Sequence, residues 1–295
     1  MRLRRVAPII CIFTLVVSSA AQRMSGSQEA EGAAAAATLA GWRSLTLCAS
    51  KPPLYEASAT FKVAEATHAA SGRPAVQFST QSQATMLGVI GFNEETTSWI
   101  DAQKHGALEF FQLRPGESAR RYLFQNGSIK QTSYGPPAEN PGAPFDAWKE
   151  KETTERRFTF AEGGEAADGE PVVDAYSLIY LLRDIDLTEP RPAPKEFIVL
   201  HRRNLVRLRL TAEDQRTGER QVLDEKSGVQ VTLKLTERRL KLQPQGEAAK
   251  SFRGLMGMQG ETEIWVDQDS RALLEINGQA SGFGATQVAL TSFSK

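Results

Sequence analysis

The chain has 295 residues, of which 41% are apolar and 24% are charged, as is ordinary for a globular protein. Its 35 basic and 35 acidic residues cancel to a formal net charge of zero. Proteins that bind the nucleic-acid backbone usually carry an excess of basic residues. The charge balance therefore argues against a general nucleic-acid binder, and we expect no nucleic-acid partner.

Residues 1–21 have the pattern of a secretory signal peptide. Three arginines precede an apolar run at residues 6–17, and small residues follow at 19–21. The run is shorter than the ~20 residues that a spanning helix needs. We therefore expect export, cleavage near Ala21 and a periplasmic mature protein without a transmembrane span. An uncleaved membrane anchor is the alternative.

The segment after the signal peptide predicts a linker rather than a folded part. Residues 22–53 contain a stretch rich in Ser, Gly, Glu and Ala with five consecutive alanines at 33–37, and no apolar stripe accompanies them. We predict a flexible tether over 22–53 and a single folded domain over 54–295. Cys48 is the one cysteine left after cleavage, so the core must hold the fold without an internal disulfide.

Alternation of apolar and polar residues predicts strands through most of this domain. The pattern begins at Tyr55 and recurs until the last residues, and Asn126-Gly127 between two such runs is a strong hairpin signal. One stretch differs. Residues 172–184 place apolar side chains at helical spacing, and Asp174 is suited to cap the first turn. We predict an all-β, mainly antiparallel fold, in which a curled sheet or half-barrel wraps this helix.

Three sequence marks carry a resemblance to a known family. They are the opening strand at Tyr55, the pattern Asp174-x-x-Ser177-x-x-Tyr180-x-x-Arg183 after a glycine-rich loop, and the late strand Glu263-Ile264-Trp265-Val266-Asp267-x-Asp269. Over about residues 54–293 the chain resembles domain-of-unknown-function family 3108, a family of exported bacterial proteins. Members often have a proline soon after the late strand, where this chain has Ser270 to Leu273, which puts the geometry of the last hairpin in doubt.

The resemblance implies a periplasmic or outer-membrane-associated protein whose curled sheet is reminiscent of the half-barrels that lipoprotein carriers use to hold acyl chains. It supplies no catalytic residues. The sequence has no Gly-x-Ser-x-Gly elbow, and its three histidines (His68, His105 and His201) lack metal-ligand spacing. We expect solvated histidines, no cofactor, no metal and no catalytic residues.

Two segments are candidates for ligand binding. The helix would present Tyr176, Tyr180 and Arg183. The Met- and Gly-rich loop at 252–258 would form a flexible lid with Leu255, Met256 and Met258, because methionine adapts to irregular ligands. Simple packing over the barrel mouth is the alternative for this loop.

A basic strand face is a further candidate. Arg207 and Arg209 share one face at strand spacing, and they would meet anionic head groups or an anionic polysaccharide, or else form a solvated outer face.

The hypothesis that joins these features is non-catalytic binding of an apolar or amphipathic cell-envelope molecule in the half-barrel. Two alternatives stay open. One is a structural protein that docks another envelope protein, and the other is an enzyme that acts on envelope polymers.

Overall fold

The computed structural model describes residues 38–51, 55–86, 89–125, 127–157, 159–160, 165–167, 170–201, 204–250, 252–280 and 284–295. The predicted signal peptide at 1–21 and residues 22–37 of the predicted tether lie outside the described residues.

Strands dominate the described chain, and fifteen of them join in one sheet. They are β1 (Ser44–Lys51), β2 (Tyr55–Thr67), β3 (Pro74–Met86), β4 (Val89–Asp101), β5 (Ala107–Arg114), β6 (Ser118–Gln125), β7 (Ser128–Gly135), β8 (Lys149–Arg157), β9 (Val172–Asp174), β10 (Lys195–His201), β11 (Asn204–Asp224), β12 (Val229–Pro244), β13 (Met258–Asp267), β14 (Leu273–Ala280) and β15 (Gly284–Ser294). The helical elements are α1 (Ser177–Leu181) and the 3₁₀ helices η1 (Phe145–Ala147), η2 (Leu182–Asp184), η3 (Glu247–Lys250) and η4 (Leu255–Gly257).

The sheet runs in the order β8 to β1, then β15 down to β9. Neighbours pair antiparallel, except that β9–β10 and an additional β11–β15 contact are parallel. The prediction of an all-β, mainly antiparallel fold with a curled sheet and one short helix is confirmed.

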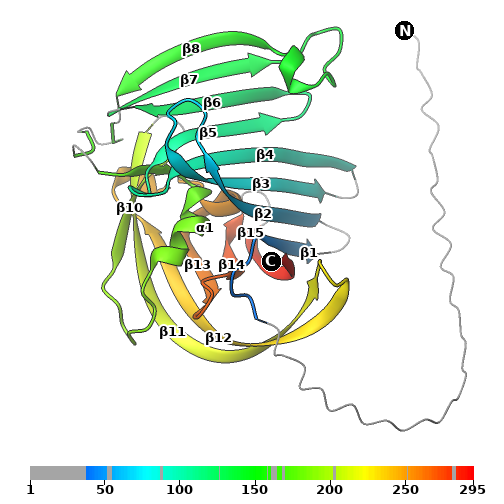
Figure 1. The fold of residues 1–295 in the computed structure, drawn as a ribbon, viewed down its shortest axis with the longest axis vertical. Coiled ribbons are helices and arrows are strands. Elements are labelled where there is room, and N and C mark those ends of the chain that lie inside the picture. Colours follow the sequence, from blue (N-terminus) through cyan, green and yellow to red (C-terminus); the bar gives the residue numbers. More distant parts are fainter. Residues whose placement is uncertain are drawn as a thin grey trace, which may run out of the picture. The chain divides into compact units, whose positions relative to one another are not determined.

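Strand β11 is 21 residues long and contacts both β10 and β15, and this double contact separates the sheet into two regions (Figure 1). Its first residues pair with β10, and its last ones reach β15, where Leu223 and Asp224 lie opposite Ser292 and Phe293. This contact closes β11–β15 into a ring of hydrogen-bonded strands, which we call the closed region. Strands β2–β8 continue the sheet without closure as the open region, and the β1–β15 pairing joins the two.

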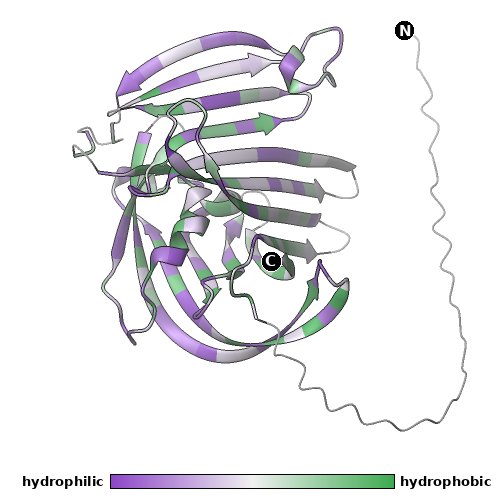
Figure 2. Ribbon diagram, in the orientation of Figure 1, coloured by the Kyte–Doolittle hydropathy of each residue, from purple (hydrophilic) through white to green (hydrophobic). Residues whose placement is uncertain are grey.

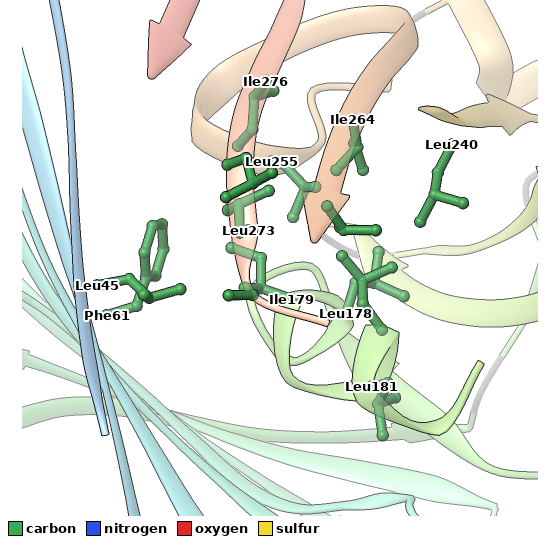
Figure 3. Close-up of a cluster of buried hydrophobic side chains, with 14 of the residues drawn as sticks. Leu45, Phe61, Leu178, Ile179, Leu181, Leu240, Leu255, Ile264, Leu273 and Ile276 are labelled. Atoms are coloured by element: carbon green, nitrogen blue, oxygen red, sulfur yellow. The ribbon is translucent and has the colours of Figure 1, made fainter. Parts of the chain in front are cut away.

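Large apolar side chains of both the closed region and β1–β2 pack around α1. Figure 3 shows Leu178, Ile179 and Leu181 of α1 gathered with side chains of the sheet, among them Leu45, Phe61, Leu240, Ile264, Leu273 and Ile276. Each of these residues is buried, with at most 3% of its surface exposed. Burial of their apolar surface is the main force that holds α1 against the sheet.

The helix predicted over 172–184 is wrong in its first part. Val172–Asp174 form β9, which pairs in parallel with Ile198–Leu200 of β10, and only 177–181 are α-helical. Two β-branched residues favour the strand, and the partner strand is distant in sequence. Asp174 nevertheless caps the helix start, since its carboxylate accepts from the backbone N–H groups of Tyr176 (2.9 Å) and Ser177 (3.0 Å).

The predicted tether over 22–53 is also wrong in its second part. Leu39 and Trp42 are buried in the core with 1% and 0% exposure, and residues 44–51 form β1, paired with both β2 and β15. Leu45 and Leu47 alternate with polar residues as in any half-buried strand, so the fold begins well before residue 54.

The free edge of the open region is β8, whose residues are charged or threonine and almost all exposed. Figure 2 shows hydrophilic colours along this strand. Charged side chains on an edge strand discourage pairing with a second sheet. Among the described residues, no helix has the length and apolar character that a membrane crossing would require.

Candidate functional site

A cavity of about 470 Å³ lies on the inner face of the open region, the face that contacts β9 and α1. Strands β2–β6 form one wall. The β9–α1 junction, the end of β10 and residues 253–257 form the other. The larger apolar side chains of the lining are Phe92, Phe110, Tyr122, Leu200 and Met256.

Strand register explains how neighbouring residues meet at this wall. Alternate residues of a strand face the same side, so Phe110, Gln112 and Arg114 of β5 all line the cavity. In β6 the register places Tyr122 opposite Phe110 and Arg120 opposite Gln112. The wall is therefore apolar at one end and cationic at the other.

Glu94 is the buried carboxylate of this wall, with 3% of its surface exposed. Its Oε1 accepts from the Tyr176 hydroxyl at 2.9 Å, and its Oε2 accepts from Gln112 Nε2 at 2.7 Å and Arg114 Nε at 3.0 Å. Burial, together with the Glu94 charge, raises the pKa of the Tyr176 phenol. Tyr176 therefore stays protonated, and it fixes the helix side of the cavity to β4 as a hydrogen-bond donor.

Asp174 forms the buried corner beside Tyr176. Burial raises the pKa of its carboxyl group, while hydrogen bonds from the Ser177 hydroxyl and backbone N–H partly oppose that shift. Both carboxylates of the lining are thus engaged in holding α1 and the sheet together.

The loop at 252–258 is held by three buried side chains, those of Phe252, Leu255 and Met258. Between them Met256 is half-buried, adopts a positive φ of 54° and lines the cavity. A positive φ is uncommon for a residue other than glycine. The loop is therefore anchored on both sides of the half-buried Met256 rather than free along its whole length.

Hydroxyl groups occupy the inner face next to the cavity. Thr80 lies opposite Thr96, and Ser82 lies opposite Glu94. The three hydroxyl oxygens are buried, and none has a hydrogen-bond partner among the described residues. Short polar side chains at these positions leave more space than leucine or phenylalanine would.

The predicted ligand-binding residues separate into two groups. Tyr176 and Met256 line the cavity. Tyr180 instead packs against Phe78, with ring centroids 6.5 Å apart. Arg183 stacks over the Trp42 ring at 4.3 Å and donates to the Trp42 carbonyl at 3.0 Å. Leu255 and Met258 belong to the hydrophobic core. The structure does not bring these four residues to the cavity: Tyr180 contacts β3, Arg183 contacts Trp42 just before β1, and Leu255 and Met258 are part of the core.

The predicted basic face on β11 has the expected alternation, since Val206, Leu208 and Leu210 are buried. Arg207 pairs with Glu170 at 3.0 Å and stacks over Phe160 at 4.9 Å, so its charge is compensated. Arg209 is exposed. A binding role for either arginine stays a prediction.

The expectation of solvated histidines is wrong for His68, which is 5% exposed. Its ring lies between the Ser71 hydroxyl at 2.9 Å and Glu109 at 3.2 Å. His105 pairs with Asp184 at 2.9 Å, and the half-buried His201 lines the cavity. Within the described ranges, no group of three or more His, Cys, Asp or Glu side chains is placed to hold a metal ion.

Four charged lining residues, Glu94, Arg114, Arg120 and Arg253, were not predicted from the sequence. Glu94, Arg114 and Arg120 come from neighbouring strands whose register is a long-range property. Arg253 lies within the predicted lid loop at 252–258, so its position in the Met-rich loop was a usable signal.

No family model matches the chain, and no curated protein matches it. Among solved structures, the chain is similar to a beta-barrel-like protein of domain of unknown function DUF1849 from Brucella abortus. The identity is 8%, the TM-score is 0.46, and the match covers 85% of this chain and 95% of that chain.

A porin-like protein from Bacteroides uniformis ATCC 8492 also matches, with 9% identity and a TM-score of 0.26, over 85% of this chain and 96% of that chain. The fold class of the present chain rests on its own strands and pairings.

Proposed function

We propose that the protein acts in the periplasm, where it binds the apolar part of an amphipathic cell-envelope molecule without catalysing a reaction. The observation that carries this proposal is the cavity between β2–β6, Tyr176 and the loop at 252–258. Its volume of about 470 Å³ lies in the range of ligand pockets, which are typically ~300–1,000 Å³.

The walls suit an apolar chain of variable shape. Aromatic side chains of β4–β6 form one side, and Met256 forms part of the other. A methionine adapts to irregular partners through its rotatable bonds, and anchoring by Phe252 and Leu255 keeps it at the cavity mouth.

Three further observations support the proposal. The signal-peptide pattern at 1–21 and the resemblance to family 3108 favour an envelope location. Both carboxylates of the lining are engaged in structural hydrogen bonds, which favours binding over acid–base catalysis.

The test fills the cavity. Ala84 lines it on β3, whereas Ala64 is exposed on β2. We expect native mass spectrometry of the protein purified gently from a Gram-negative periplasm to show a co-purifying lipid. Ala84→Phe should remove most of that lipid, and Ala64→Phe should leave it unchanged.

An apo mass for the unaltered protein, together with no binding of added amphiphiles, would contradict the proposal. It would favour the docking of another envelope protein instead. Equal lipid content in Ala84→Phe and Ala64→Phe would place the lipid outside this cavity.

A further inference from the structure

The charges around the cavity do not cancel. Its lining contains three arginines (Arg114, Arg120 and Arg253) and two carboxylates, Glu94 and Asp174. Which of these charges remains available to a ligand depends on the partners that each group already has.

One arginine is already neutralised. Arg114 donates to the buried carboxylate of Glu94 at 3.0 Å, and its guanidinium group lies 5.4 Å from the centroid of the Phe92 ring. Asp174 is 2% exposed and accepts the first N–H groups of α1. Neither carboxylate is therefore free to balance a further cation at the mouth of the cavity.

The other two arginines remain uncompensated. Arg120 and Arg253 are both exposed, and neither side chain has an ion-pair or hydrogen-bond partner among the residues that the structure describes. They come from opposite walls, Arg120 from β6 and Arg253 from the loop that carries Met256. The backbone N–H of Arg253 lies 3.3 Å from His201 Nε2, which ties this part of the loop to the end of β10.

A cavity with apolar walls and two guanidinium groups that have no side-chain partner among the described residues favours a ligand with an apolar part and an anionic group. A guanidinium group binds a carboxylate or a phosphate through two parallel, charge-assisted hydrogen bonds. A ligand with a neutral hydroxyl group cannot form this pair of bonds. Low-dielectric walls also strengthen the attraction for an anion.

We infer that the bound molecule is an anionic amphiphile, whose acyl chain occupies the cavity and whose carboxylate or phosphate is held by Arg120 and Arg253. This inference rests on the proposed function and adds to it the charge of the head group.

The test compares probes of equal chain length and different head group, namely hexadecanoate, hexadecyl phosphate and hexadecanol. Binding to the exported protein is measured by isothermal titration calorimetry. We expect both anions to bind on the order of tenfold more tightly than the alcohol, because unpaired cations at a binding site favour the anion. The preference should fall as salt is raised from about 0.05 M to about 0.5 M.

Two variants separate the contributions. Arg120→Gln/Arg253→Gln should remove the preference for the anions and leave the affinity for hexadecanol within about twofold, since it alters no apolar lining residue. Arg191→Gln is the matched control, because it removes an exposed arginine that lies outside both the cavity lining and the predicted basic face.

Each contrary result has a distinct meaning. If hexadecanol binds as tightly as hexadecanoate, or the double variant keeps the preference, the head-group inference is overturned while the apolar cavity stands. If none of the three probes binds, both the inference and the proposed function are overturned.

Discussion

The closed and open regions use the same antiparallel pairing but have different interiors. In the closed region, one face carries Leu240, Leu242, Ile264 and Ile276, all buried. In the open region, the corresponding face carries short or polar residues such as Thr80, Ser82, Thr96 and Gln112 beside the aromatic residues Phe110 and Tyr122. Large aliphatic residues fill the space between strands, as expected for a protein core. Where they are replaced by small hydroxyl residues, a cavity remains.

The two regions also differ in how they treat buried charge. In the closed region, Glu237 is 2% exposed and accepts a hydrogen bond from Arg216 Nε at 2.8 Å. Arg220 Nη2 donates to Glu237 at 3.0 Å and to Glu275 at 3.2 Å. Arg216 also stacks over Trp265 at 3.7 Å. This cluster satisfies its charges internally, whereas two arginines at the cavity of the open region have no side-chain partner among the described residues.

The largest effect should come from a void in the closed region. Leu240→Ala removes a fully buried side chain beside α1 and should lower the free energy of unfolding by about 2–5 kcal/mol. Met256→Ala at the cavity wall should cost less than about 1 kcal/mol, because the residue already borders open space. Denaturant unfolding of both variants measures the difference. Equal losses would mean that the two interiors are packed alike.

Disrupting the charge cluster should have the next largest effect. Glu237→Gln leaves Arg216 and Arg220 with Glu275 as their remaining carboxylate. It should destabilise the fold by about 2–4 kcal/mol near neutral pH, scaled down from a fully buried pair because Arg216 is partly exposed. Unfolding by urea, compared with the exposed control Glu219→Gln, measures this loss.

The same carboxylate predicts a pH dependence. Burial opposes ionisation of Glu237, but hydrogen bonds from Arg220 and Arg216 outweigh it and lower the pKa of Glu237. A folded-state pKa below the unfolded value gives stability that is present above about pH 4.3 and is lost as the pH falls further. Glu237→Gln should flatten this acidic part of the stability profile. An unchanged acid slope would show that other carboxylates produce it.

The smallest effect should follow from changing a hydroxyl of the open region. Thr80→Val removes a buried hydroxyl that has no partner among the described residues, so the free energy of unfolding should stay the same or rise within about 0.5 kcal/mol. Thermal unfolding is sufficient to measure it. A loss above about 1 kcal/mol would reveal a hydrogen bond that this hydroxyl makes in solution.

Local sequence pattern was sufficient for the fold class and insufficient for the site. Alternation within strands is a local property, so the run from Tyr55 onward predicted the sheet. The first part of the predicted helix failed because Val172 and Val173 pair with a strand more than twenty residues later, and that partner cannot be read from the helix window. The start of the fold was missed because Leu39 and Trp42 follow an alanine-rich stretch whose composition predicted a flexible tether.

The site residues also divide into those that local sequence pattern indicated and those that depend on long-range strand pairing. Tyr176 and Met256 stood in segments that were unusual in themselves, a single helix and a Met/Gly loop. Glu94, Arg114 and Arg120 look like ordinary strand residues, and only the β4–β5–β6 register brings them together. Which side chains meet on a cavity wall that spans several strands depends on the register between those strands, and local sequence pattern does not predict this register.

The pairing of β1 with β15 has a consequence for how the chain folds. It joins Ser44 to Ser294, residues from near the two ends of the described chain, and β15 also completes the ring by meeting the end of β11. Contacts so distant in sequence slow folding, because a long loop must close before they form. β15 therefore takes part in completing both regions. Until β15 pairs, the ring of β11–β15 is open, so the native interior forms only after this strand is in place.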